Sequence, residues 1–274
     1  DFPLAEGIIL STGNVVDAVG ENDDSETSTG FGGAGDSHLT SIAGLETNDA
    51  SVLEFDFMPA GDIVQFRYVF ASEEYAEYAC SNFNDVFAFL LSGPDINDGS
   101  REQAENIALL DDGTTPVMIS TVHGYERDRT TVSRVYDTNG AFSDWRGRYY
   151  RETNWVDKTS CSPVNSHLYV DNQNRERIVY QGGRIRDVYN TEGSYDIEYD
   201  GRTIILTATY NVKKCNTYHI KLAIADVADD NFDSAVFLEA KSFKSNEVTV
   251  ENKIDGLDGD KEIMYRGCDK SYIS

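Results

Sequence analysis

The chain has few cysteines, prolines and basic residues. Its 274 residues include 4 cysteines, 5 prolines and 23 lysines and arginines, against 48 aspartates and glutamates. The formal net charge is −25 and the pI is about 4.3. Such a negative field repels phosphate backbones, which argues against nucleic acid as a partner. It suits a protein that works in salt or binds divalent cations, because crowded carboxylates need counter-charge.

Long apolar runs are also missing. No stretch approaches the roughly 20 consecutive apolar residues of a membrane-spanning helix, so we expect no direct membrane insertion. The chain begins DFPLAEGIIL, with neither methionine nor a signal peptide. This start predicts a processed or excised piece of a longer protein.

The four cysteines are Cys80, Cys161, Cys215 and Cys268, and they show no CxxC spacing. This pattern argues against zinc or thioredoxin-like chemistry. An even number of cysteines in an acidic, Tyr-rich and Lys-poor chain favours an exported protein with disulfides. We expect Cys80 to pair with Cys161, because both fall in loops that a disulfide would hold together. Cys215 then pairs with Cys268, unless Cys268 belongs to a following module.

Strand signals dominate the sequence. Short runs such as SVLEFDFMP, IVQFRYVFAS and DVFAFLLSG are rich in aromatic and β-branched residues and are bounded by Gly, Asn, Asp or Pro. Only residues 101–110 have a helical pattern, with Ser100 as the N-cap. The first 50 residues are rich in Gly, Ser, Thr and Asp, which predicts loops. We therefore expect an all-β fold, a β-sandwich or jelly roll of two mainly antiparallel sheets with long loops and one short helix.

Residues 125–190 differ in composition from the rest of the chain. They hold 10 of the 14 arginines and both tryptophans, and their net charge is +2. This composition resembles that of interaction surfaces and predicts contact with a surface glycan or a protein ligand. The alternative is an elaborated loop whose arginines pair with the acidic body and whose aromatic residues cover the edge of the core. The candidate contact residues are Trp145, Arg146, Arg148, Tyr149, Tyr150 and Trp155.

Acidic and amide side chains gather in loops between the apolar runs. Residues 73–85 lie between two such runs, residues 226–233 precede another, and neither loop contains Lys or Arg. Crowded carboxylates there repel one another unless a cation binds. Calcium takes six to eight oxygen ligands, which such loops supply. The alternative is a rim of solvated turn residues. The candidate calcium ligands are Asp36, Glu73, Glu74, Asn82, Asn84, Asp85, Asp226, Asp229, Asp230 and Asp233.

Catalytic patterns are weak in this chain. Glu73 and Glu74 are adjacent, so on a strand they would face opposite sides and could not flank one glycosidic bond. The four histidines lie in no serine or cysteine motif. We therefore predict a chain without catalytic activity and keep a glycoside hydrolase as the weaker alternative.

Several motifs occur in an order typical of one family: GIILSTGNV, GDSHLTSIAG, FRYVFASEEYAEY, NDVFAFLLSGP and TYHIKLAIADVADDNFDSAVFLEAKSF. Through them the chain resembles the choice-of-anchor L domain of bacterial secreted and surface proteins, from Gly7 to Phe243. The resemblance implies a β-rich adhesive or recognition module in a large, exported multidomain protein. Residues 125–161 fit the family pattern poorly, so we expect the specificity of this chain to lie there.

Together these observations predict one domain over residues 1–247, with an insertion at about 125–190, and a strand and linker at 248–274 that lead to a following module. We expect an extracellular recognition or adhesion module of a bacterial surface protein, stabilised by calcium. Its partners are a surface glycan or protein ligand and neighbouring modules of the same polypeptide or fibre. A lectin-like carbohydrate binder or glycan-active enzyme is the first alternative, and a structural subunit of a surface fibre is the second.

Overall fold

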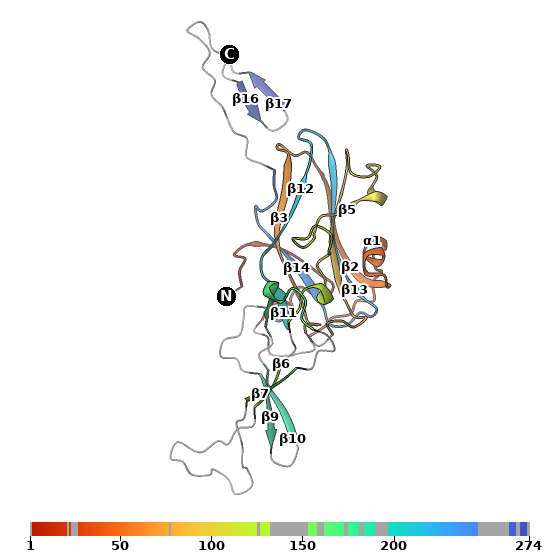
Figure 1. Ribbon diagram of the computed structural model, residues 1–274. Coiled ribbons are helices and arrows are strands. Elements are labelled where there is room, and N and C mark those ends of the chain that lie inside the picture. Colours follow the sequence, from red (N-terminus) through yellow and green to blue (C-terminus); the bar gives the residue numbers. More distant parts are fainter. Residues whose placement is uncertain are drawn as a thin grey trace.

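Two antiparallel sheets face each other in the computed structural model of the chain (Figure 1). Among the described residues, no helix is long and apolar enough to cross a membrane. The structure describes residues 2–20, 22, 27–76, 78–124, 127–131, 153–157, 162–172, 175–180, 184–189, 197–245, 263–266 and 269–272.

The larger sheet has seven strands and is built around one long strand, β3 (Ile63–Ser72). On one side β3 pairs with β14 and β15, and β1 pairs with the outer edge of β14. On its other side β3 pairs with β12 and β11, and β8 pairs with β11. The bounds of these strands are Gly7–Ser11 for β1, Tyr169–Asp171 for β8, Gly201–Thr203 for β11, Leu206–Asn211 for β12, Ser234–Glu239 for β14 and Lys244–Ser245 for β15.

The smaller sheet has four strands in the order β2-β13-β4-β5. Its central strand, β13, pairs antiparallel with β2 on one side and with β4 on the other. The bounds are Thr47–Phe57 for β2, Val86–Ser92 for β4, Glu105–Asn106 for β5 and Tyr218–Val227 for β13. The prediction of an all-β sandwich of two mainly antiparallel sheets is therefore confirmed.

Aromatic side chains fill the space between the two sheets. Alternate residues of a strand share a face, so Tyr68 and Phe70 of β3 meet Phe87 and Phe89 of β4 in one buried cluster. The ring centroids of Tyr68 and Phe89 are 4.9 Å apart, and those of Phe70 and Phe87 are 5.2 Å apart. These contacts hold the two sheets together and fix the ends of β3 and β4 close to each other.

A second apolar layer explains why β4 is buried on both faces. The helix α1 (Ser37–Ala43) places Leu39 against Val86, Ala88 and Ala223 on the outer face of the smaller sheet. Small alanines on this face let the helix approach closely. The residues that read as one apolar run in the sequence therefore divide between two layers.

The helix lies in a different place from the predicted one. Residues 101–110 contain only a 3₁₀ turn, η1 (Arg101–Gln103), followed by β5, and Ser100 makes no side-chain capping bond. The extended backbone lets Ile107 N donate to Phe89 O at 2.8 Å and brings the side chain of Ile107 into the core. The prediction of a helix at 101–110 is wrong because tertiary pairing with β4 outweighs local helical preference. The first 50 residues also hold β1 and α1, so they are not all loop.

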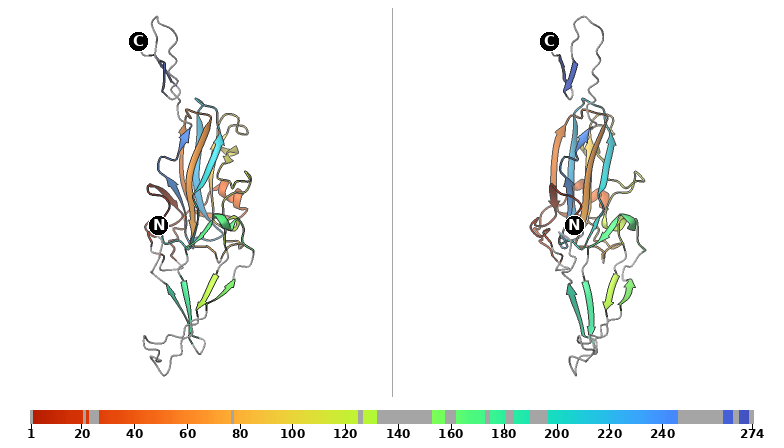
Figure 2. Two further views of the ribbon diagram at one scale, coloured as in Figure 1. Left: turned by 60° about the vertical axis from the view of Figure 1, so that its left-hand side comes forward. Right: turned by 90° about the vertical axis from the view of Figure 1, so that its left-hand side faces the viewer.

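The inserted segment forms a further sheet of four strands, in the order β10-β9-β6-β7. Figures 1 and 2 show this inserted sheet beyond the end of the sandwich at which β11 lies. β8, from the middle of the same segment, returns to pair with β11 in the larger sheet. The bounds are Arg127–Thr131 for β6, Thr153–Asp157 for β7, Arg175–Tyr180 for β9 and Arg184–Tyr189 for β10.

Short elements complete the fold. The 3₁₀ turns η2 (Ile119–Thr121) and η3 (Ser166–Leu168) precede and follow the first half of the insertion. A hairpin of β16 (Ile263–Arg266) and β17 (Asp269–Tyr272) lies at the other end of the sandwich from the inserted sheet (Figure 1).

Candidate functional site

Three buried carboxylates meet where strands of both sheets end, and we call Glu74, Asp85 and Asp226 the carboxylate centre. Glu74 follows the end of β3, Asp85 immediately precedes β4, and Asp226 lies near the end of β13. β4 and β13 pair so that Val86 lies opposite Ala225, which brings Asp85 and Asp226 together. Only 1%, 0% and 1% of Glu74, Asp85 and Asp226 is exposed.

The three carboxylates differ in their hydrogen bonds. Asp85 accepts from Val227 N at 2.9 Å and from Ser234 Oγ at 2.6 Å, so it joins β4 to β13 and β14. Both side-chain oxygens of Asp226 and Oε2 of Glu74 are buried without a well-formed hydrogen bond in the described part of the chain, although the Thr12 hydroxyl lies near enough to Asp226 to act against the rise of its pKa. Burying a carboxylate without a partner is costly, so these oxygens mark an unsatisfied site.

The electrostatics of the centre add to this conclusion. Burial raises the pKa of Glu74 strongly, and the charges of Asp85, Asp226 and Asp229 raise it further. Burial and the charge of Asp85 raise the pKa of Asp226 in the same way. Burial also raises the pKa of Asp85, against the opposing effect of its hydrogen bonds. Within the described residues, no ion pair with Lys, Arg or His involves these three groups. Among the residues that the structure describes, the centre therefore lacks the counter-charge that three carboxylates need.

A second group of acids binds the loop at residues 28–33, and we call Asp17, Asp49 and Asp233 the loop latch. Asp49 accepts from Phe31 N at 2.7 Å, from Gly32 N at 3.2 Å and from Gly33 N. Asp233 accepts from Thr29 N at 3.0 Å, and Asp17 accepts from Thr29 Oγ1 at 2.5 Å. Burial raises the pKa of Asp233 to about 6, although the bond from Thr29 N opposes this. Backbone N–H groups thus bond to Asp49 and Asp233, a hydroxyl bonds to Asp17, and no side-chain oxygen of the latch is buried without a partner.

Asp36 has a structural role outside the centre. Its side chain accepts from the backbone N–H groups of His38 and Leu39 and so caps α1, and it also forms an ion pair with Lys221. Burial acts to raise the pKa of Asp36, but the hydrogen bond from Lys221 and the capping bonds outweigh it and the pKa is lowered. A carboxylate with these partners is already compensated.

The other predicted ligands take separate positions. Asp229 accepts from Asn231 N at 3.2 Å, and its charge acts on Glu74. Asn84 accepts from Ser120 N at 2.8 Å, and Asn82 is exposed. The remaining two residues are Glu73, which is buried with its charge near Tyr199, and Asp230, which lies against Gly30. Of the ten predicted ligands, the structure brings Glu74, Asp85 and Asp226 together, with Asp229 and Asp233 near enough for their charges to act on the centre.

Sequence reasoning missed the hydroxyl groups at the centre. Ser234 Oγ bonds to Asp85, and Ser234 N donates to Thr12 Oγ1 at 2.9 Å, beside Asp226. Ser234 follows Asp233 at the start of an apolar run, and that adjacency was the available signal. Asp17 and Asp49 were missed as well, because nothing local shows that their partners lie in residues 29–33.

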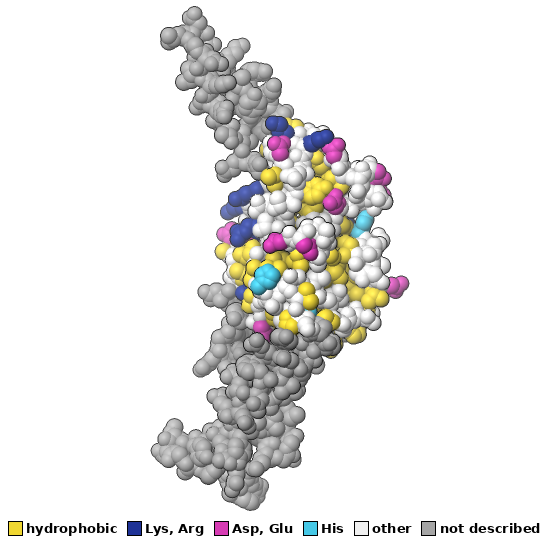
Figure 3. Space-filling model, viewed as in Figure 1, with side chains coloured by type: hydrophobic (Ala, Val, Ile, Leu, Met, Phe, Trp, Pro, Cys, Tyr) yellow, Lys and Arg dark blue, Asp and Glu magenta, His cyan; other side chains and the backbone are white. Residues whose placement is uncertain are grey.

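The oxygen donors of the centre fit a hard cation. Carboxylates and hydroxyls suit calcium or magnesium better than zinc or copper. Among the described residues, no three Asp, Glu, His or Cys side chains are arranged as a ready-made metal site. A calcium ion here would combine two or three carboxylates with hydroxyl, carbonyl or water oxygens, which is usual for calcium. On the face shown in Figure 3, the exposed acids of the described residues are scattered.

The predicted contact residues and cysteines are only partly described. Trp155 belongs to β7, whereas Trp145, Arg146, Arg148, Tyr149 and Tyr150 lie outside the described residues, as do Cys161 and Cys268. Cys215 is a free, exposed thiol, which contradicts the expected pair with Cys268. Cys80 is not a free thiol, and its pairing with Cys161 stays a prediction.

The fold and the site together define a class of protein. An antiparallel sandwich with an aromatic core and functional loops at one end is an architecture common in cell-surface domains. The family model of the choice-of-anchor L domain matches residues 1–154 and 148–244, and the chain belongs to the choice-of-anchor L domain family. It is therefore a surface-associated, β-rich domain of a cell-surface or secreted protein. Comparison with curated proteins and with solved structures finds no match to the chain.

Proposed function

We propose that this domain is a calcium-stabilised, non-catalytic recognition or adhesion module of a bacterial surface protein, with the inserted segment as its contact surface. The observation that carries the proposal is the carboxylate centre beneath the inserted sheet. Among the described residues, Oε2 of Glu74 and both side-chain oxygens of Asp226 have neither a well-formed hydrogen bond nor a cationic partner.

A bound calcium ion would offset the cost of burying three carboxylates together. Without an ion, the fold must either bury unpaired charge or keep these carboxyl groups protonated. A bound divalent cation neutralises the repulsion and supplies each free oxygen with a partner. Because the native state alone assembles the ligands, binding stabilises it by about 2.7 kcal/mol when calcium exceeds its Kd 100-fold.

The position of the centre relates calcium to recognition. Ser72, at the end of β3, pairs with Ser234 on one side and with Gly201 on the other. Gly201 in turn pairs with Asp171 of β8, which belongs to the inserted segment. An ion at Glu74 and Asp226 would therefore restrict the motion of the strand ends that carry the insertion. The insertion would then lose less conformational entropy when it binds a ligand.

Burial argues against a catalytic role for the same carboxylates. A glycoside hydrolase needs two carboxyl groups that reach opposite sides of a bound glycosidic bond. Glu74, Asp85 and Asp226 are almost wholly enclosed, so a sugar ring cannot reach them without opening the fold. The Arg- and Trp-rich insertion offers planar, apolar groups with polar tips, which suit stacking on sugar rings or contact with a protein.

A glycan array tests the proposal, with the purified domain applied in calcium and in chelator. We expect binding in calcium, weaker binding in chelator, and loss of binding when Trp145, Tyr149, Tyr150 and Trp155 are all replaced by alanine. That variant should keep the melting temperature of the parent. The matched control is Phe31→Ala, which removes an aromatic ring that is 65% exposed outside the insertion. Glycan turnover in place of binding, or full binding by the fourfold variant, would contradict the proposal.

A further inference from the structure

β1 and β12 (LTATYN) are the edge strands of the larger sheet in the described sandwich that carry neither charge nor proline, and an apolar groove lies beside β1. Sheet edges are usually kept from pairing with other chains by shortness, charge or proline. β8 and β5, at two other edges, have only three and two residues, and β2 carries Asp49, Glu54 and Asp56. β1 has the sequence GIILS, with no charge and no proline.

The register of β1 shows which of its backbone groups point outward. Glu6 O accepts from Ala240 N, and Thr12 N donates to Ser234 O. Alternate residues of an antiparallel strand bond to the same neighbour, so Ile8 and Leu10 also bond to β14. The N–H and C=O groups of Gly7, Ile9 and Ser11 therefore point away from the sheet. No described strand pairs with this edge, so the groups form a ready-made template for one more strand.

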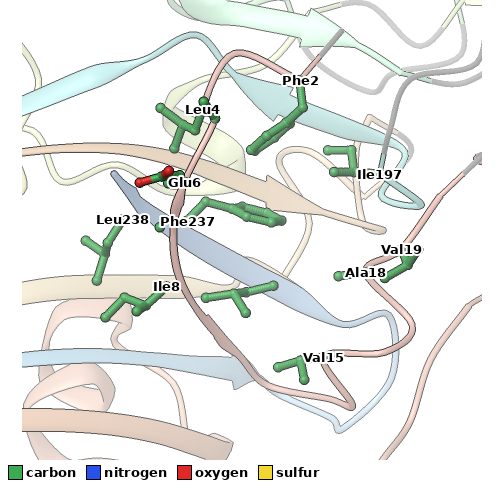
Figure 4. Close-up of a pocket in the computed structure, with 13 residues that line it drawn as sticks. Phe2, Leu4, Glu6, Ile8, Val15, Ala18, Val19, Ile197, Phe237 and Leu238 are labelled. Carbon is green, nitrogen blue, oxygen red and sulfur yellow. The ribbon is translucent and has the colours of Figure 1, made fainter. Parts of the chain in front are cut away.

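An apolar groove runs beside this edge. A hollow of about 440 Å³ is lined by residues on both sides of the N-terminal segment. Figure 4 shows Ile8 and Leu238 on one side, and Phe237, Val15 and Val19 on the other. A second hollow of about 390 Å³ shares Ile9 and Val15 with the first and continues to the start of β2.

The side chains around the groove are unusually exposed for their type. The exposed fractions of Ile8, Val15, Val19 and Phe31 are 52%, 47%, 74% and 65%. A run of exposed apolar side chains beside unpaired backbone groups is the combination that strand-adding partners use. Backbone bonds would supply affinity, and the groove would select apolar side chains at alternate positions.

We infer that β1 accepts an additional β-strand from another protein, an extended segment that is apolar at alternate positions and free of acidic residues. Charge decides the occupant. A second copy of this chain carries the same formal net charge of −25, and like net charges oppose association. A neutral or basic strand meets no such repulsion. This inference goes beyond the proposed function, because it concerns a different surface and a protein partner.

A library of random twelve-residue peptides displayed on phage tests the inference. The domain is immobilised in calcium, and enriched peptides are synthesised and measured by calorimetry. We expect enriched peptides to alternate apolar and polar residues and to lack Asp and Glu. Failure to enrich any peptide overturns the inference, as does enrichment of peptides without alternation. Concentration-dependent dimerisation of the domain through β1 would make a second copy the occupant and would also overturn it.

Two matched pairs of variants locate the binding edge. Ile9→Pro removes the outward N–H, whereas Ile9→Ala removes the same side chain but keeps that group. Ile8→Lys adds a charge to the β1 edge, whereas Val52→Lys adds the same charge at β2, where Val52 is 44% exposed. We expect Ile9→Pro and Ile8→Lys to weaken peptide binding by about tenfold or more relative to their controls. Equal binding by Ile8→Lys and Val52→Lys would overturn the inference even if Ile9→Pro failed to fold.

Discussion

Asp49 and Asp233 of the loop latch are buried like the three acids of the carboxylate centre, but the two groups differ in what their oxygens contact. In the latch, Asp49 accepts hydrogen bonds from three successive backbone N–H groups. In the centre, both side-chain oxygens of Asp226 are buried without any such donor in the described structure. Burial and negative charge are common to the two groups. Only the missing donors point to an ion, and this difference separates a structural acid cluster from a candidate calcium site.

The largest effect on stability is expected at the latch. Asp49→Ala leaves Phe31, Gly32 and Gly33 without an acceptor, and bonds to a charged acceptor contribute more than neutral ones. We expect the free energy of unfolding to fall by about 3 kcal/mol, equally in calcium and in chelator. Urea denaturation measures this change, and Asp62→Ala, at an exposed acid, is the control. A loss seen only in calcium would place Asp49 in an ion site and end the distinction between the two groups.

At the carboxylate centre, the effect of a substitution on stability should depend on calcium. In calcium, Asp226→Asn should lose the ion's contribution, which is about 2.7 kcal/mol when calcium is 100-fold above Kd. In chelator the same variant should be as stable as the parent or more stable, because it no longer buries an unpaired charge. Urea denaturation of the parent and of Asp226→Asn, in calcium and in chelator, measures whether the variant is less stable only when calcium is present. Equal destabilisation with and without calcium would show that Asp226 has a purely structural role.

The smallest effect is expected at Asp36, an acid that has a cationic partner. Asn is also a good N-cap, so Asp36→Asn keeps the cap of α1 and removes only the ion pair with Lys221. We expect a loss of about 1–2 kcal/mol at neutral pH, because the Lys221 side chain is only 16% exposed and keeps its charge without a partner.

The pH dependence of that loss has a definite sign. The pKa of Asp36 is lowered in the folded state, so its contribution is present above the unfolded-state pKa of about 4 and is lost as the pH falls through the folded-state value. The difference between the parent and Asp36→Asn should therefore vanish in acid, as measured by urea denaturation across a pH series. A difference that grows in acid would mean that Asp36 carries a raised pKa, like the acids of the centre.

The fold class could be predicted because the alternation of apolar and polar residues along a strand is a local signal in the sequence. β3 shows it clearly in IVQFRYV, where Val64, Phe66 and Tyr68 are buried and the residues between them are partly exposed. The helix could not be placed in the same way. α1 has only seven residues, too few for helical periodicity, and its one local signal is Asp36 before SHL. The segment at 101–110 has helix-forming residues, but Ile107 enters the core by pairing with Phe89 of β4, and Leu110 enters it from a turn in which its N–H donates to Thr115 O.

The members of the carboxylate centre were predicted, but within a larger set. Asp85, Asp226 and Asp233 have the same local character, an acid beside an apolar strand. What separates them is a set of contacts far apart in the chain, such as Val227 N to Asp85 across 142 positions and Thr29 N to Asp233 across 204. Whether a carboxylate oxygen has a hydrogen-bond donor depends on those long-range contacts, so no local sequence pattern can show it.

The most direct test of the account is a thermal unfolding scan of the domain in calcium, in magnesium and in chelator at one ionic strength. If calcium occupies the carboxylate centre, the melting temperature should rise with calcium concentration by about 5–10 °C at 100-fold excess over Kd, less with magnesium, and not at all for Asp226→Asn. Superimposable curves for the parent in calcium and chelator would contradict the account and leave the carboxylate centre as a buried acid cluster without an ion.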